Sequence, residues 1–204
     1  MINTTSDFVD TFFHNKKGKF LELGSENANP SGLEEPFWNL LLGDWHGVYV
    51  EPNPYSLEKL ITNVTPYHAD VIAAAWSDKS QILPFYASST HPYCSSFDEE
   101  WNIKYIPEGA RHIKYHADKI YVSTITTDQI FNKFGYDFDA ISIDIELPAD
   151  ASFKLLQTID FNKLPKCTLV ILEMINDEIE TFMSSNGFTR TLIGDAYKNW
   201  AWTR

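Results

Sequence analysis

The stretch GVYVEPNPYSLEKLITNV, residues 47–64, decides the fold class of this chain. Residues 47–53 form a short apolar run that ends in polar residues, a pattern typical of a strand buried on both faces of a sheet. Residues 54–64 carry helix start signals in Pro54 and Ser56. The stretch therefore predicts a strand followed directly by a helix.

Four further apolar runs repeat this pattern on either side of it. They are FLELG at 20–24, DVIAAAWSD at 70–78, AISIDIE at 140–146 and CTLVILEM at 167–174. Helices are also expected over Glu34 to Leu42 and over Thr127 to Phe134, where Asp128 favours a helix start. Alternating strands and helices predict a three-layer α/β fold around a mostly parallel sheet.

Two parts of the chain depart from this alternation. Within residues 79–125, the segments QILPFYASS and KIYVSTIT read as extended chain around a loop rich in Pro, Ser and Tyr. We call the loop from about Ala87 to Trp101 the variable loop and expect it to contact a substrate, although an ordinary surface excursion is the alternative. After Gly187, two alternating segments around Gly194 and Asp195 predict a terminal hairpin, and hence an antiparallel strand.

Length and charge set the limits on the class of protein. The chain has 204 residues, 16 Lys and Arg against 28 Asp and Glu, and a formal net charge of −12. This length predicts one domain over 1–204, with residues 1–17 as an N-terminal extension. The acidic balance argues against nucleic acid as a partner, because such binding depends on clustered basic residues.

The sequence also bears on the cellular compartment. No run approaches 20 apolar residues and the N-terminus lacks a signal-peptide pattern, so membrane spanning and secretion are both disfavoured. Cys94 and Cys167 lie far apart and match no paired metal site or dense disulfide framework. We therefore expect a cytoplasmic protein without a membrane partner, whose oligomeric state the sequence leaves open.

Polar residues follow the apolar runs, where a doubly wound sheet binds its ligand. They are Glu22, Gly24 and Ser25 after the first run, Glu51 and Asn53 after the second, Ser77 and Asp78 after the third, and Asp144 and Glu146 after the fourth. A glycine at the first turn allows close approach of the backbone to a ligand. The carboxyl edge of the sheet is therefore the predicted site.

Glu51 has two interpretations. An acidic residue at the end of the second strand can accept hydrogen bonds from both hydroxyls of a ribose. A carboxylate there can instead cap the following helix. Gly24 in the preceding turn favours the ribose interpretation.

Asp144 and Glu146 stand two apart, so both carboxylates can point into one cleft if the strand continues. A solvated strand end is the alternative. His91 in the variable loop is a candidate proton acceptor, with an ordinary surface histidine as its alternative. His112 and His116 have the spacing of a metal pair, but no third ligand is recognisable and we predict no metal site.

Taken in order, these pieces resemble the FkbM-type methyltransferases of the Rossmann-like, S-adenosylmethionine-dependent class. The resemblance spans about residues 18–204 and rests on FLELGSENANPSG, LLGDWHGVYVEPNPYSLEKL, DVIAAAWSD, VSTITTDQIF, FDAISIDIE, TLVILEM and GFTRT with NWAWTR. It implies a seven-stranded sheet of order 3-2-1-4-5-7-6 with an antiparallel seventh strand. It also implies S-adenosylmethionine as the cofactor.

The resemblance assigns roles residue by residue. Glu22 matches the acid that steadies the first loop, and Gly24 with Ser25 matches the turn against the methionine part of the cofactor. Glu51, followed by Pro52, matches the ribose-binding acid. Ala75 and Trp76 match the positions that flank adenine, and Asp144 matches the acid near the methionine end and the acceptor.

The chain departs from the family pattern at two places beside this site. Glu22 replaces Asp and Ser25 replaces Ala in the first loop, whose second glycine comes only at Gly32. Leu147-Pro148 follows Asp-x-Glu where the family usually has Gly.

Methylation of a hydroxyl on a small molecule or carbohydrate is the function that the resemblance implies. Positioning supplies much of the catalysis of such a displacement, and Asp144, Glu146 or His91 could act as the base. A nicotinamide oxidoreductase is a second hypothesis, supported by Gly24 and Glu51 but lacking G-x-G-x-x-G. A cofactor-binding or interaction domain without catalysis is a third, motivated by the altered first loop and Leu147-Pro148.

Overall fold

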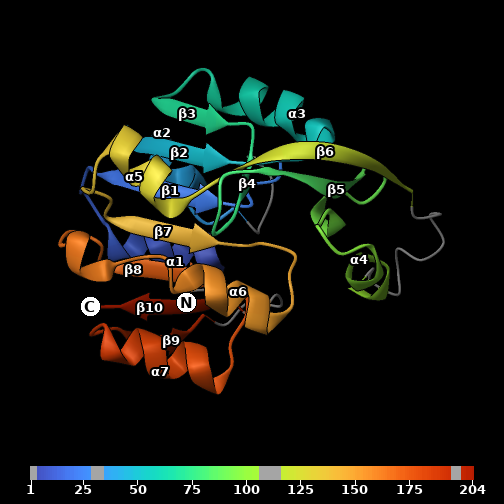
Figure 1. Cartoon of the computed structure of the whole chain (residues 1–204). Coiled ribbons are helices and arrows are strands. Elements are labelled where there is room, and N and C mark those ends of the chain that lie inside the picture. The colour runs from blue at the N-terminus through green and yellow to red at the C-terminus, as the bar shows by residue number, and fades with distance from the viewer. Residues whose placement is uncertain (1–3, 29–34, 106–115, 194–198) are drawn as a thin grey trace.

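The computed structural model describes residues 4–28, 35–105, 116–193 and 199–204. Its main sheet has seven strands, in the order β3-β2-β1-β7-β8-β10-β9 (Figure 1). Their bounds are β1 Lys19–Leu23, β2 His46–Val50, β3 Ala69–Ile72, β7 Ala140–Ile143, β8 Leu169–Leu172, β9 Thr189–Leu192 and β10 Trp200–Thr203. The first five pair in parallel, whereas β10 runs antiparallel to both β8 and β9.

A second, three-stranded sheet projects from the first and has the order β4-β6-β5. It consists of β4 Ala75–Trp76, β5 Ile82–Ser88 and β6 Ala117–Ile125, and β5 pairs antiparallel with β6 over its whole length. The mostly parallel α/β sheet of seven strands is as predicted. The described part of the chain has ten strands in all, however, so the order of the main sheet is 3-2-1-7-8-10-9 instead of the expected 3-2-1-4-5-7-6. The difference arises because these three strands fall between β3 and β7 and form a sheet of their own.

Helices cover both faces of the main sheet (Figure 1). One face carries α1 Thr5–Phe12, α2 Trp38–Leu42 and α3 Pro54–Val64, and the other carries α5 Thr127–Phe134, α6 Ala149–Leu156 and α7 Asp177–Ser185. The remaining helix, α4 Glu99–Tyr105, accompanies the second sheet, and short 3-10 turns occur at Pro92–Cys94 and Phe161–Lys163. Alternate residues of β1, β2, β3, β7, β8 and β10 enter the two core clusters, which is the expected three-layer arrangement.

The predicted helices 54–64 and 127–134 are confirmed with the same bounds. The helix expected over 34–42 begins later, at Trp38, because Pro36 disfavours helical geometry in the residue before it. The predicted start of that helix, Glu34, lies outside the described residues.

The single strand expected over 70–78 is wrong. The chain leaves the main sheet after Ile72 and enters the second sheet at Ala75, so that β3 pairs with β2 while β4 pairs with β6. The antiparallel pairing of β9 with β10 confirms the terminal hairpin. Its predicted turn, at Gly194 and Asp195, lies outside the described residues.

The segment predicted as an N-terminal extension contributes to the core. Val9 of α1 is fully buried, and the ring of Phe13 meets that of Trp45 edge-on, with the ring centroids 4.8 Å apart. Both cysteines are buried and free. Among the described residues, no helix combines the length and the apolar character needed to cross a membrane.

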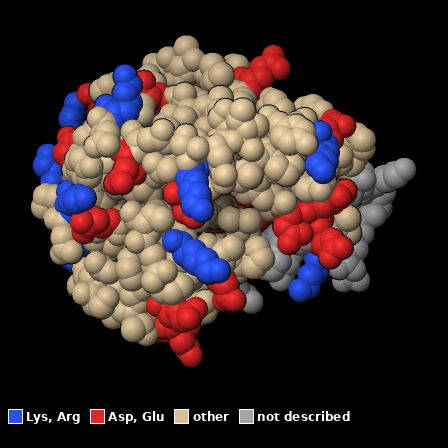
Figure 2. All heavy atoms as spheres, viewed as in Figure 1, with Lys and Arg blue, Asp and Glu red and all other residues tan. Residues whose placement is uncertain are grey.

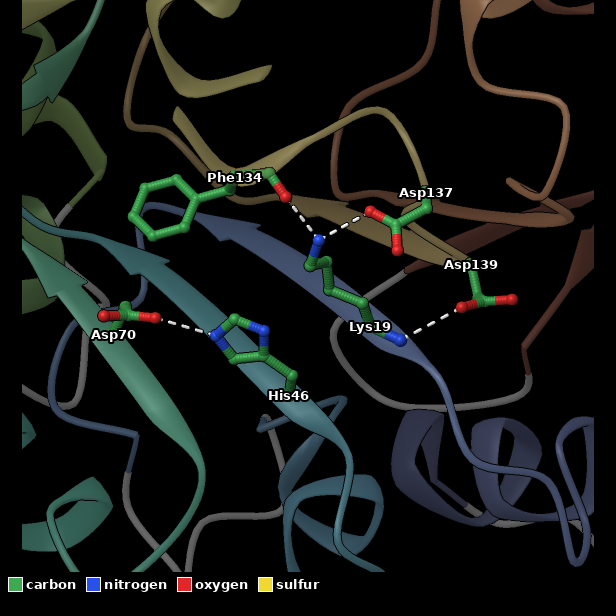
Figure 3. A network of polar contacts seen from close by, with 6 residues as sticks. All are labelled: Lys19, His46, Asp70, Phe134, Asp137 and Asp139. Atoms are coloured by element: carbon green, nitrogen blue, oxygen red, sulfur yellow. Dashed lines mark hydrogen bonds and ion pairs between the residues drawn. The ribbon is translucent and has the colours of Figure 1, made fainter. Parts of the chain in front are cut away.

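Polar groups at the amino edge of the main sheet pair with one another (Figure 3). Lys19, which begins β1, donates from Nζ to the Asp137 carboxylate at 2.6 Å and from its backbone N–H to Asp139 at 3.0 Å. The hydrogen bond from Lys19 Nζ lowers the pKa of Asp137. His46, which begins β2, lies 2.7 Å from the Asp70 carboxylate. These polar contacts join the strand ends at the edge that lies opposite the carboxyl ends of the parallel strands.

Candidate functional site

A cavity of about 600 Å³ lies at the carboxyl ends of β1, β2 and β7, between the main sheet and the second sheet. Seven residues that the sequence proposed for the site line it: Gly24, Glu51, Pro52, Ala75, Trp76, Asp144 and Glu146. Three do not, namely Glu22, Ser25 and His91. Because parallel strands end at one edge, the sheet itself brings these distant segments together.

Gly24 allows the ends of three strands to meet. Its φ of +84° suits glycine, and its N–H donates to the carbonyl of Val50 at 3.0 Å. A Cβ at this position would lie 1.8 Å from the carbonyl oxygen of Asp144. A side chain here would therefore push the β7 end away from the first loop.

Glu51 is a buried acid whose carboxylate is held by the backbone. Its Oε2 accepts from the N–H of Glu26 at 2.8 Å, and its Oε1 accepts from the N–H of Asn53 at 2.6 Å. Burial raises the pKa of Glu51 to about 8, and the two N–H donors partly oppose that rise. The cap of α3 is Asn53, whose Oδ1 accepts from the N–H of Tyr55, so Glu51 does not fill that role.

An apolar wall faces Glu51 across the cavity. Ala75 and Trp76 of β4 are both more than nine-tenths buried, and the Trp76 indole N–H donates to Thr127 Oγ1 at 2.9 Å. Phe85 of β5, Tyr93 and Phe97 extend this wall. The second sheet thus supplies flat aromatic surface beside the acids of the main sheet.

Three carboxylates converge at the ends of β7 and β8. Oxygens of Asp144, Glu146 and Glu173 all lie within 4.8 Å of one another, a spacing that could hold a cation. Leu147, one of the departures from the family pattern, also lines the cavity, and Pro148 takes the N-cap position of α6.

Asn53 ties the variable loop to the β2 end. Its Nδ2 donates to the carbonyl of Ser88 at 3.2 Å and to Ser95 Oγ at 2.9 Å. Ser96 donates to the carbonyl of Glu146 and bridges to Tyr86. The loop is therefore anchored to the ends of β2 and β7, two of the strands that supply acidic groups.

His91 is not at the cavity wall. It is 1% exposed, its N–H donates to Ser88 Oγ, and its Nδ1 lies 3.0 Å from Thr90 Oγ1. The loop turns at Pro92 and presents Tyr93 and Cys94 to the cavity instead. Burial raises the pKa of Cys94 to about 12, which leaves it a weak nucleophile. His112 lies outside the described residues.

Glu22 and Ser25 line a second, smaller cavity of about 170 Å³ together with Glu35. The two cavities share Gly24 and Asp144 among their lining residues. No local signal in the sequence points to Glu35 or to Asn199, which lines both cavities. Glu173 could have been found, because it follows the apolar run of β8 as Asp144 follows that of β7.

Acidic groups dominate the described lining of the main cavity. Glu26, Glu51, Asp144, Glu146 and Glu173 contribute to its wall, and none of its described lining residues is Lys, Arg or His. Figure 2 shows further acidic side chains gathered on the face near the start of α4, where Glu99 and Glu100 form the first turn. Such a site favours a ligand that carries positive charge.

The comparisons with known proteins agree with this geometry. A family model described as the methyltransferase FkbM domain matches residues 22–189. The crystal structure of methyltransferase FkbM from Methylobacillus flagellatus KT superposes with a TM-score of 0.58 and 10% identity, over 99% of this chain and 48% of that one. This chain thus spans about half the length of that protein, and at such low identity the likeness shows the fold alone.

Two other comparisons find weaker similarity or none. A precorrin-6y C5,15-methyltransferase from Geobacter metallireducens GS-15 matches with a TM-score of 0.41 and 11% identity, over 96% of this chain and 86% of that one. No curated protein matches in a comparison of sequences. The family model covers well over half of the sequence and includes the strand ends that build the cavity. The chain belongs to the FkbM methyltransferase domain family.

Proposed function

We propose that this protein is an S-adenosylmethionine-dependent O-methyltransferase that acts on a hydroxyl of a small molecule or sugar. One observation carries the proposal. A single cavity holds a buried acid at the end of β2, an aromatic wall on β4, and carboxylates at the ends of β7 and β8. The first two features suit a nucleoside, and the third suits an acceptor that must lose a proton.

The residues present fit the cofactor. The Glu51 carboxylate is fixed by two backbone donors and keeps lone pairs for the two ribose hydroxyls. Trp76 and Ala75 offer an apolar surface for the adenine ring. The cavity volume lies within the range of about 300–1,000 Å³ that small-molecule and cofactor sites occupy.

S-adenosylmethionine supplies a methyl group on a cationic sulfur when it is bound. The carboxylates of Asp144 and Glu146 could orient the acceptor hydroxyl and accept the proton that it loses on methylation. A carboxylate suits this role because the acceptor proton becomes acidic only during methylation.

The variable loop is placed to select the acceptor. Tyr93 and Phe97 face the cavity from the side of the second sheet. Aromatic side chains commonly pack against the apolar faces of sugar rings and other small molecules. Specificity for the acceptor would then depend on a different element from cofactor binding.

Calorimetry with S-adenosylhomocysteine is the first test. We expect binding at micromolar concentration and no binding of NAD. NAD binding without S-adenosylhomocysteine binding would favour the oxidoreductase hypothesis. A methyl-labelled cofactor offered with a library of hydroxyl compounds is the second test. Cofactor binding without transfer to any acceptor would favour a domain that has lost catalysis.

A further inference from the structure

The second cavity contains buried polar atoms without partners. Glu22, Ser25 and Glu35 are 4%, 3% and 7% exposed. Within the described part of the chain, Glu22 Oε2, Ser25 Oγ and Glu35 Oε1 have no hydrogen-bond partner, and all three residues line this cavity. Buried polar atoms without partners are costly, so they mark a place where a ligand can replace the missing contacts.

Glu22 and Glu35 lie side by side and interact through their carboxyl groups. Two buried carboxylates in contact repel each other unless a proton lies between them. Other acids add to this repulsion, because Asp144 and Glu51 act on Glu22, and Glu26 acts on Glu35. Burial raises the pKa of Glu35 to about 7 and that of Glu22 well above its usual range.

The shape and charge of this cavity suit a small cation with several N–H donors. An ammonium group donates three hydrogen bonds, and two carboxylates with one hydroxyl supply three acceptors. The two cavities are neighbours through Gly24 and Asp144. A ligand whose nucleoside part occupies the main cavity can therefore extend an attached amino-acid group into the second cavity.

We propose that Glu22 and Glu35 share one proton in the free protein and release it to solvent when the ammonium of the cofactor's amino-acid end enters the second cavity. No covalent bond changes in this exchange. The pair goes from one negative charge to two, the ammonium keeps its positive charge, and one proton leaves. This inference rests on the proposed function, because it takes the cofactor from there.

Calorimetry in buffers of different ionisation enthalpy measures the protons released. The probes are S-adenosylhomocysteine, which has the amino-acid end, and 5′-methylthioadenosine, which lacks it. Glu51 also titrates in this range, but it meets the ribose of both ligands and contributes equally to both. At pH 7.5, above the pKa of Glu35, the pair holds one proton, and we expect S-adenosylhomocysteine to release about one proton more than 5′-methylthioadenosine does. Its affinity should also rise more steeply with pH, by up to about tenfold per pH unit for each proton released.

The Glu35→Gln variant tests which residues hold the proton. It removes the second titrating carboxyl and its repulsion of Glu22 while keeping the size of the side chain, so the difference in proton release between the two ligands should fall. Glu58→Gln, an exposed acid on α3, is the matched control and should leave the difference intact.

The outcomes separate this inference from the proposed function. Equal proton release with both ligands would overturn the exchange and leave the methyltransferase proposal standing. An undiminished difference in Glu35→Gln would overturn the assignment to this pair. Failure of both ligands to bind the wild-type protein would overturn the proposed function, and this inference with it.

Discussion

Two glycines with nearly the same φ allow the cost of a strained backbone to be distinguished from the cost of a steric clash. Gly24 and Gly187 have φ values of +84° and +83°. A Cβ at Gly24 would collide with the carbonyl oxygen of Asp144, whereas a Cβ at Gly187 meets nothing within 4 Å. An alanine at either position would therefore have the cost of a positive φ, but only at Gly24 would its Cβ also clash with neighbouring backbone.

We predict that Gly187→Ala costs about 1–2 kcal/mol of stability, the cost of placing alanine at a positive φ. Gly24→Ala should cost several kcal/mol more, because the end of β7 must also move. Urea unfolding of both variants measures the difference. Equal losses would show that the first loop yields to the added methyl group without displacing Asp144.

Glu51 offers a direct test of cofactor recognition. We predict that Glu51→Ala weakens S-adenosylhomocysteine binding by about 1.5–3 kcal/mol, the range for losing a charge-assisted hydrogen bond. Calorimetry measures the loss, and circular dichroism checks that the variant is folded. Unchanged affinity in a folded variant would restrict Glu51 to holding the backbone of Glu26 and Asn53.

At the scale of elements, the sequence correctly predicted the helices whose ends are stabilised by residues close to them in the chain. Helix α5 has the expected bounds because Thr126 and Gln129 form a capping box, and α3 has them because Asn53 and Pro54 define its start. The division of 70–78 between two sheets was missed. It depends on pairing with β6, which lies some 50 residues further along the chain.

The same distinction applies to the site. Acids that directly follow a strand were predictable, because the end of a strand fixes their position at the rim of the sheet. Glu35, Asn199 and Tyr93 reach the cavities from connecting segments, and the direction of such segments is set by tertiary contacts. His91 was assigned to the site for its chemistry, but it is buried and does not line the cavity.

Asn53 caps a helix and also anchors the variable loop, whereas the side chain of Asn176, within the described part of the chain, makes a cap to α7 alone. We predict that Asn176→Ala costs about 1 kcal/mol of stability, as the loss of a cap does. Asn53→Ala should cost about 2–4 kcal/mol, because two buried hydrogen bonds to Ser88 and Ser95 are lost as well. Urea unfolding measures both, and similar losses would mean that the loop is held by its other contacts.

The 3-10 turn Pro92–Cys94 belongs to the acceptor side of the cavity in the proposed function. Its replacement by Gly-Ser-Gly keeps Ser88 and Ser95, and with them the anchor to Asn53. We predict loss of methyl transfer while S-adenosylhomocysteine affinity stays within about threefold, because the nucleoside contacts lie on β2 and β4. Lost cofactor affinity would assign the turn to the nucleoside, and undiminished turnover would remove it from the site.

At the scale of the whole molecule, the buried acids affect both stability and ligand binding. The chain carries a net charge of −12, and three of its acids, Glu22, Glu35 and Glu51, are buried around the site. Each has a pKa above its usual value. A fold that keeps such groups beside a cavity gives up stability at neutral pH for a site that attracts a cation.

The sign of the resulting pH dependence follows from the raised pKa values. Between pH 4.5 and about 8 the folded protein binds more protons than the unfolded chain, so the free energy of unfolding falls as pH rises. We predict a loss of about 2–4 kcal/mol between pH 6 and pH 8 for the ligand-free protein, measured by urea unfolding. Glu35→Gln and Glu51→Gln should each flatten this slope, and the exposed Glu58→Gln should not. A free energy of unfolding that stays level or rises over this range would mean that the buried acids remain ionised in the folded protein, stabilised by cations that replace the missing partners.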